Sequence, residues 1–228
     1  MVKKGDFIEI IFTGKIKNSD LIFDTSIVEK EKKDSVIICL GANSLLKSLE
    51  AKLEGKEIEK DYEIDLSFEE AFGKKDPKLI KIIQTKVFVD KKVNPVPGLQ
   101  VNIDGAIATI RSVSGGRCVV DFNHPLAGRN LVYFVKIKKI VTDVKEKIDS
   151  TMRLDFPFIK EYKFENGILI IYSEKMEPKL REIIQNRIKE VIPELKTINF
   201  EEKTIKNIER SKGRDVETNK PKKIPEKT

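Results

Sequence analysis

The chain has 228 residues, enough for one large domain or for two small ones with a tail, and we expect at least two folding units. It carries 44 Lys and Arg against 37 Asp and Glu, a net charge of +7, with both signs intermixed along the sequence. Dedicated nucleic-acid binders usually gather basic residues on one face, so we expect no nucleic-acid partner.

Two further features concern the compartment. Apolar runs stay shorter than the ~18 residues of a membrane span, and no signal-type stretch follows Met1, so no membrane association is expected. Cys39 and Cys118 lie in apolar stretches, which is typical of buried, reduced thiols. These features predict a cytoplasmic protein.

The N-terminal half predicts an antiparallel sheet with one helix packed on it. Residues 6–16 are mostly apolar, which indicates a strand covered on both faces, and residues 61–68 alternate apolar and polar like a half-buried strand. Between them, residues 43–55 carry leucines at helical spacing, with Asn43 or Ser44 as the cap and Gly55 at the end. A last strand is expected at residues 131–141.

A small β-rich unit is predicted within this half. The turn signals Asp104-Gly105 and Gly115-Gly116 divide residues 99–122 into three short strands that form a meander.

After Asp149 the pattern restarts as ββαβ. Residues 161–164 and 168–172 flank an Asn166-Gly167 turn, and residues 197–200 form the closing strand. Between the second and third strands, a helix from about Pro178 ends at Pro193 and carries one apolar stripe of Leu180, Ile183, Ile184, Ile188 and Val191. From Lys203 onward the chain is polar and is expected to be disordered.

The usual catalytic constellations are missing. The chain has one His, no Cys-x-x-Cys pair, no glycine-rich phosphate loop and no His-Glu-x-x-His motif, so we expect neither metal nor cofactor. What remains is an apolar set around Phe23-Asp24-Thr25-Ser26. From the residues alone, this set is either a hydrophobic core or a binding pocket, and Asp24 belongs either to a self-bonded turn or to a site.

Several segments resemble FKBP-type prolyl isomerases. They are residues 15–26 with Phe23-Asp24-Thr25-Ser26, residues 41–55, and Glu70-Ala71-Phe72-Gly73. Residues 121–128, Asp-Phe-Asn-His-Pro-Leu-Ala-Gly, with residues 131–135, resemble the SlyD-like branch and its long archaeal form. The resemblance covers roughly residues 1–142, and it implies a chaperone module, the insert-in-flap domain, where the meander is predicted.

The resemblance also implies a site. It assigns catalysis to Asp24, Phe72 and Tyr133, with the N–H of Leu46 holding a substrate carbonyl. It assigns substrate binding to Phe12, Phe23, Val36, Leu45, Leu46, Leu49 and His124. His124 has two interpretations, a structural role in the loop before Pro125 or a place at the pocket rim. The histidine-rich tail of bacterial SlyD is absent, so nickel binding is not expected.

These features together predict an α+β protein with four parts. Residues 1–84 and 123–149 form the FKBP domain, 85–122 the insert, 150–202 a C-terminal α+β domain and 203–228 the tail. The leading hypothesis is prolyl cis/trans isomerisation of unfolded or partly folded proteins and proline-containing peptides, with chaperone activity. The alternatives are a holdase without catalysis and a ribosome- or RNA-associated factor. About 50 residues make a marginal core, so the C-terminal domain is expected to bind either a second copy, as a homodimer, or a client.

Overall fold

The computed structural model describes residues 1–27 and 35–202, and the chain divides into two compact units, with the boundary between Ile140 and Val141. Within the described ranges, no helix combines the length and apolar character needed to cross a membrane. The predicted tail from Lys203 lies outside the described residues.

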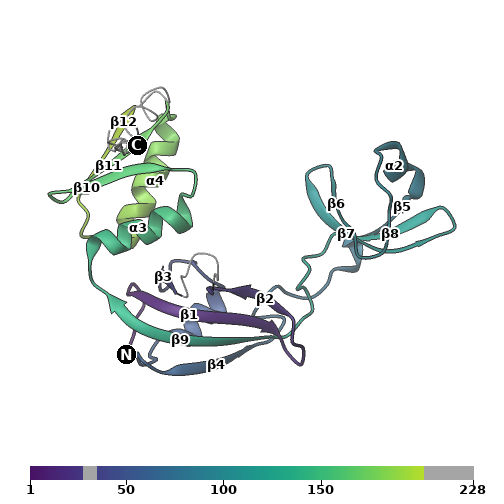
Figure 1. Cartoon of the computed structure of the whole chain (residues 1–228), viewed down its shortest axis with the longest axis horizontal. Helices are drawn as coiled ribbons and strands as arrows, with labels where there is room; N and C mark the ends of the chain where they lie inside the picture. Colours follow the sequence, from purple (N-terminus) through teal and green to yellow (C-terminus); the bar gives the residue numbers. More distant parts are fainter. Residues whose placement is uncertain (28–34, 203–228) are drawn as a thin grey trace, which may run out of the picture. The chain divides into compact units, whose positions relative to one another are not determined.

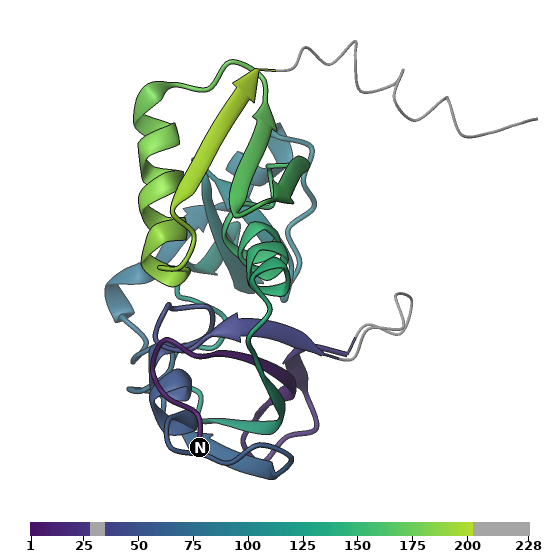
Figure 2. The same cartoon turned by 90° about the vertical axis from the view of Figure 1, so that its left-hand side faces the viewer.

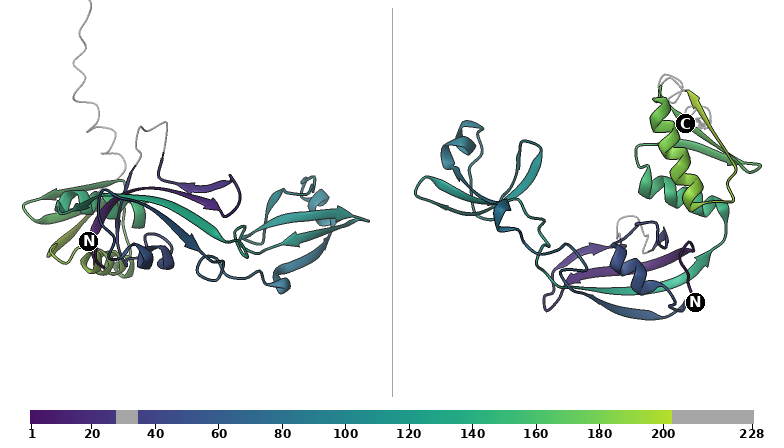
Figure 3. Two further views of the ribbon diagram at one scale, coloured as in Figure 1. Left: turned by 90° about the horizontal axis from the view of Figure 1, so that it is seen from below. Right: turned by 180° about the vertical axis from the view of Figure 1, so that it is seen from behind.

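The first unit contains a five-stranded sheet with the order β2-β1-β9-β4, in which β3 also pairs with β1 (Figure 1). The pairs β1–β2, β1–β3 and β4–β9 are antiparallel. One helix, α1, packs against the sheet (Figure 3). These elements are β1 (Phe7–Ile16), β2 (Ile22–Thr25), β3 (Val36–Cys39), α1 (Lys47–Leu53), β4 (Asp61–Leu66) and β9 (Leu131–Val141). The predicted α+β fold with a sheet and one packed helix is confirmed.

The core of this sheet follows the sequence pattern. In β4 the side chains of Ile64 and Leu66 are buried while Asp61, Glu63 and Asp65 are exposed, as the alternation predicted. In β1 only one face is fully buried, because Glu9, Ile11 and Thr13 on the other face are partly exposed. The prediction that both faces of this strand are covered is therefore confirmed for one face and only in part for the other, where Phe7 is buried and no residue is fully exposed.

Helix α1 begins later than predicted. Its N-cap is Leu46, no side chain caps it, and Asn43 adopts the left-handed backbone conformation with φ 61°. The expected cap at Asn43 or Ser44 is wrong, because residues 43–46 form a loop ahead of the helix. At the other end, Gly55 has φ 75°, the conformation expected of a glycine that follows a helix.

The insert is a four-stranded sheet with the order β5-β8-β7-β6 (Figure 1). The predicted meander corresponds to β6 (Gln100–Ile103), β7 (Ala106–Ser114) and β8 (Arg117–Asp121). Three elements that the sequence patterns did not predict precede them: a 3-10 turn (Pro77–Leu79), β5 (Ile80–Gln84) and α2 (Thr85–Asp90). The insert has its own apolar core around Phe88, Ile110 and Val120. Cys118 lies in this core, and both it and Cys39 are buried and free, as predicted.

The second unit contains a three-stranded sheet, β10-β11-β12, with α4 alongside it (Figure 2). Strands β10 and β11 are antiparallel, whereas β11 and β12 are parallel. The bounds are β10 (Glu161–Glu165), β11 (Ile168–Ser173), α4 (Pro178–Val191) and β12 (Thr197–Glu202). The predicted ββαβ order is confirmed.

Two expectations about this unit need correction. Helix α3 (Val144–Asp155) was missed, and the predicted boundary between residues 149 and 150 falls inside it. In α4, Ile184, Ile188 and Val191 are buried, but Leu180 is 39% exposed and Ile183 is 54% exposed. The apolar stripe is therefore wider than the buried face of the helix. The four-part division and the homodimer stay predictions.

Candidate active site

Three aromatic rings from three strands meet in the core of the first sheet. Tyr133 of β9 is 3% exposed, and its ring centroid lies 6.2 Å from that of Phe12 in β1. Phe23 of β2 meets Tyr133 edge-on, with centroids 5.6 Å apart and ring planes at 86°. Edge-to-face contacts of this kind stabilise aromatic pairs beyond the effect of burial. The rings therefore form a rigid apolar wall.

The apolar residues that the resemblance assigned to the site gather around this wall. Leu49 of α1 is fully buried in the same cluster as Phe12 and Tyr133. A second group is only partly buried and packs against that cluster: Phe23, Val36, Leu45, Leu46 and Phe72. Because part of their apolar surface stays open to solvent, the second group can contact an apolar ligand while the first supports it.

A buried carboxylate in α1 shapes the loop that precedes the helix. Glu50 is 3% exposed and accepts hydrogen bonds from the N–H groups of Gly41 at 2.8 Å, Asn43 at 3.2 Å and Leu45 at 2.7 Å. This role of Glu50 was not predicted from the sequence. Its only signal was a charged residue directly after Leu49, whose side chain was predicted to be buried. The carboxylate of Glu50 therefore binds the backbone N–H groups ahead of the helix, where a capping side chain of Asn43 or Ser44 had been expected.

The N–H of Leu46 is the polar group that this loop presents. Its carbonyl oxygen accepts from Leu49 and Glu50, which begins α1, whereas among the described residues its N–H donates no hydrogen bond. An N–H at this position can bind a carbonyl oxygen from a ligand.

Asp24 lies on β2, opposite Gly14 of β1, and is exposed. The surrounding apolar residues nevertheless raise the pKa of its carboxyl, because they desolvate the charged form more than the hydrogen bond from the Thr25 N–H favours it. Burial, together with the charge of Asp24, raises the pKa of Tyr133, so the phenol stays neutral. The carboxylate and the phenol thus share one side of the cluster.

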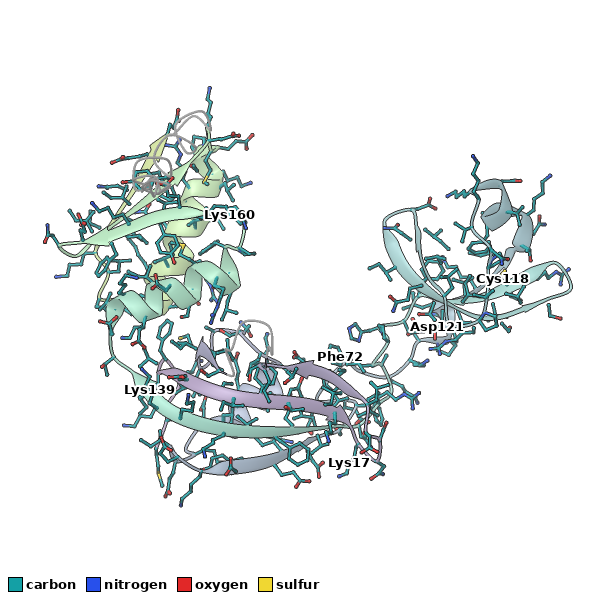
Figure 4. All side chains as sticks on the ribbon, in the orientation of Figure 1. Lys17, Phe72, Cys118, Asp121, Lys139 and Lys160 are labelled. Atoms are coloured by element: carbon teal, nitrogen blue, oxygen red, sulfur yellow. The ribbon has the colours of Figure 1, made fainter. Side chains whose placement is uncertain are left out.

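His124 contacts the site through Phe72, which is labelled in Figure 4. The two rings stack with centroids 4.0 Å apart and planes at 8°. His124 itself is exposed, and its Nδ1 accepts a hydrogen bond from the N–H of Leu126 at 3.2 Å. The residue therefore has both features that were weighed as alternatives, an ordered place in its loop and contact with a site residue.

The described residues contain no cluster of three or more His, Cys, Asp or Glu side chains that could hold a metal ion. The site offers instead an apolar surface, one carboxylate and one open backbone N–H. Such a set suits a reaction that makes and breaks no covalent bond.

Comparison with known proteins adds the family context. Residues 1–89 match the model of the FKBP-type peptidyl-prolyl cis-trans isomerase family, and residues 81–126 match the model described as "FKBP26, IF domain". The chain is similar to a short-type peptidyl-prolyl cis-trans isomerase of Methanocaldococcus jannaschii, with 25% identity over 61% of this chain and 94% of that relative.

Two bacterial relatives match over shorter stretches. An FKBP-type 16 kDa peptidyl-prolyl cis-trans isomerase of Escherichia coli is 30% identical over 44% of this chain and 70% of its own length. The isomerase SlyD of Aeromonas hydrophila is 29% identical over 51% of this chain and 56% of its own length.

Proposed function

The chain belongs to the family of FKBP-type peptidyl-prolyl cis-trans isomerases, and from this premise we propose that the cluster around Tyr133 accelerates X-Pro rotation in unfolded or partly folded proteins. The observation that carries the proposal is the aromatic wall, with a carboxylate and an open N–H at its edge.

The chemistry of the reaction fits these groups. An X-Pro bond faces a rotation barrier of ~18–20 kcal/mol because the twisted state loses amide resonance. The twisted imide is less polar than the planar one, so an apolar surface of Phe23, Leu46 and Phe72, supported from behind by Phe12 and Tyr133, binds it in preference to the planar substrate. Each ~1.4 kcal/mol of such preference gives about tenfold in rate.

Two polar groups orient the substrate. The Leu46 N–H would bind the carbonyl of the peptide, which fixes the chain while the prolyl ring turns. Asp24 would act through its negative charge on the carbon and nitrogen of the rotating bond, whose charge distribution changes as resonance is lost. Partly desolvated, this carboxylate interacts more strongly than it would in water.

Chaperone activity is proposed for the insert. Several large apolar side chains of this module are exposed, among them Ile82 at 68% and Ile107 at 67%, with Ile80, Val87, Val89 and Val96. Unfolded proteins offer apolar segments that would cover these side chains. The proposed setting is a reducing compartment, because Cys39 and Cys118 are both free thiols.

The catalytic proposal is tested by Asp24→Asn. At neutral pH this variant should lose much of kcat/KM on a proline tetrapeptide, measured without a coupled protease. Its thermal midpoint should stay equal or rise slightly. The reason is the raised pKa of Asp24: the ionised carboxyl costs folding stability once the pH exceeds that pKa, and the amide removes this cost.

The pH profile adds a second measurement. With the ionised carboxyl as the active form, wild-type kcat/KM should fall on acidification at a pH above the usual range for Asp, and Asp24→Asn should lack this step. Wild type with no rate above uncatalysed exchange would reject the isomerase and leave the two alternatives without catalysis, of which aggregation suppression by the insert would favour the holdase. A rate of Asp24→Asn equal to wild type would remove Asp24 from the mechanism.

A further inference from the structure

The chain crosses twice between the five-stranded sheet of the first unit and the insert, and hydrogen bonds join the two crossings. We call them the neck, residues 72–79 and 121–130. The N–H of Gly128 donates to the carbonyl of Gly73 at 2.8 Å, and that of Phe122 to the carbonyl of Leu79 at 2.9 Å. Between these bonds, the Asn123 amide both accepts from the Asp76 N–H and donates to the Asp76 carbonyl, at 2.8 and 3.0 Å.

A buried carboxylate lies at the insert end of the neck (Figure 4 labels Asp121). The side chain of Asp121 is 1% exposed. Its Oδ2 accepts from Nε and Nη2 of Arg111 at 3.0 and 2.8 Å and from Nζ of Lys75 at 3.1 Å. Its Oδ1 accepts from the N–H and the amide of Asn123 at 2.9 and 2.8 Å. Asp121 therefore binds both crossings and strand β7.

The carboxyl of Asp121 stays ionised. Burial alone would raise the pKa of Asp121, but the hydrogen bonds from Asn123, Arg111 and Lys75 outweigh it and hold that pKa well below its usual range. A buried charge with all its partners in place makes a rigid network, whereas loss of one partner leaves the others desolvated and unpaired.

Strand β7 is shaped for this contact. The register of β7 against β8 shifts between Ile110, which pairs with Val120, and Ser112, which pairs with Val119. Arg111 is the extra residue at this bulge. Bulges redirect a side chain out of the regular alternation, and here the redirected guanidinium reaches Asp121 in a two-pronged contact.

At its other end the neck holds a stacked pair of rings. They belong to Phe72, which directly precedes Gly73, and to His124, which directly follows Asn123. We propose that Asp121 is a positioning residue, which holds the neck closed and thereby keeps His124 stacked on Phe72 at the edge of the active site. Its effect on catalysis rests on the proposed function, but its effect on the stack does not.

The single histidine of the chain makes the stack directly measurable. In the labelled full-length protein, the imidazole C–H signals of His124 should be shifted upfield by the ring current of Phe72, and Phe72→Leu calibrates the signal without that ring. Asp121→Asn and Arg111→Gln should move the His124 signals toward the Phe72→Leu position. Both should also lower kcat/KM on a proline tetrapeptide about fivefold, as is typical for loss of ~1 kcal/mol.

Matched controls carry the same chemical changes in the same module. Asp104→Asn and Arg117→Gln alter exposed residues of the insert and should leave both the His124 signals and the rate unchanged. If Asp121→Asn does not fold, Arg111→Gln decides the matter, because the Arg111 side chain is 46% exposed and leaves no large cavity.

Unmoved His124 signals in a folded Asp121→Asn or Arg111→Gln variant would overturn the proposal. Displaced signals in a protein whose wild type catalyses nothing would support the positioning role and reject the isomerase.

Discussion

Gly14 lies in β1 at the point where the rings of Phe23 and Tyr133 pack against the strand. A Cβ atom there would lie 2.8 Å from Cζ of Phe23 and 2.9 Å from Cε1 of Tyr133, closer than carbon atoms approach one another. The residue is buried, and its φ is not positive, so space rather than backbone conformation requires glycine. Gly14 thus determines how closely two rings of the candidate site approach the sheet.

Gly14→Ala should therefore disturb the site as well as the fold. Both rings would have to move, and overpacking of this kind costs about 1–3 kcal/mol of unfolding free energy. We expect a lower thermal midpoint and a lower kcat/KM on a proline tetrapeptide. Adding Phe23→Leu removes the closest ring atom and should restore part of the midpoint, so a double variant less stable than the sum of the single changes would contradict this account.

At the residue scale, sequence patterns predicted which apolar residues gather but not what holds them. The spacing of the helical leucines and the alternation in β4 identified buried positions such as Leu49, Leu53 and Ile64, whereas Leu45, which shares that spacing, is only partly buried. A glycine inside a strand does indicate a close approach. Its partners, however, come from β2 and β9, and no local pattern relates those strands to Gly14.

Helix α1 illustrates the same limit at the scale of the element. Capping rules are local, and they favoured Asn43 or Ser44 as the start. The structure instead uses Glu50, which reaches back from within the helix to hold three N–H groups of the loop. Helix α3, by contrast, left a readable signal: Asp143 caps it by accepting from the Glu146 N–H, and the buried Ile148 and Met152 follow at helical spacing.

Glu50→Gln should loosen the loop that carries Leu45 and Leu46. The amide keeps one acceptor oxygen but turns an N–H₂ group toward backbone donors, and loss of hydrogen bonds to a charged group costs about 1.5–3 kcal/mol. We expect a lower thermal midpoint, and a lower kcat/KM because the Leu46 N–H loses its fixed position. Glu54→Gln, an exposed change at the end of the same helix, is the control. An unchanged midpoint and rate in Glu50→Gln would show that the loop holds itself.

At the scale of the whole molecule, the insert is a module with an apolar core of its own. Its core of Phe88, Ile110, Cys118 and Val120 is distinct from the cluster around Tyr133. Sequence patterns predicted its meander because turn residues mark hairpins. Strand β5 was missed despite its β-branched Ile80, Ile82 and Ile83, because α2 follows it with no turn between them and its partner β8 is distant in the sequence. Long-range pairing leaves little trace in a short stretch of sequence.

Excision of the insert separates its contribution from that of the catalytic sheet. Removal of residues 80–121 can be bridged by a short glycine linker, because the flanking Leu79 and Phe122 are already joined by a 2.9 Å hydrogen bond. The shortened protein lacks Asp121, so its kcat/KM on a proline tetrapeptide should fall only as far as in Asp121→Asn, about fivefold. Catalysis of a proline-limited refolding reaction should fall at least ~100-fold, because the insert no longer holds the client near the site and its high effective concentration is lost. Suppression of client aggregation should disappear as well.

The intact protein carrying Asp104→Asn, which keeps the insert, controls for surface charge. Equal losses on peptide and protein substrates would mean that the insert only completes the fold, and full aggregation suppression without it would move the client surface elsewhere in the chain.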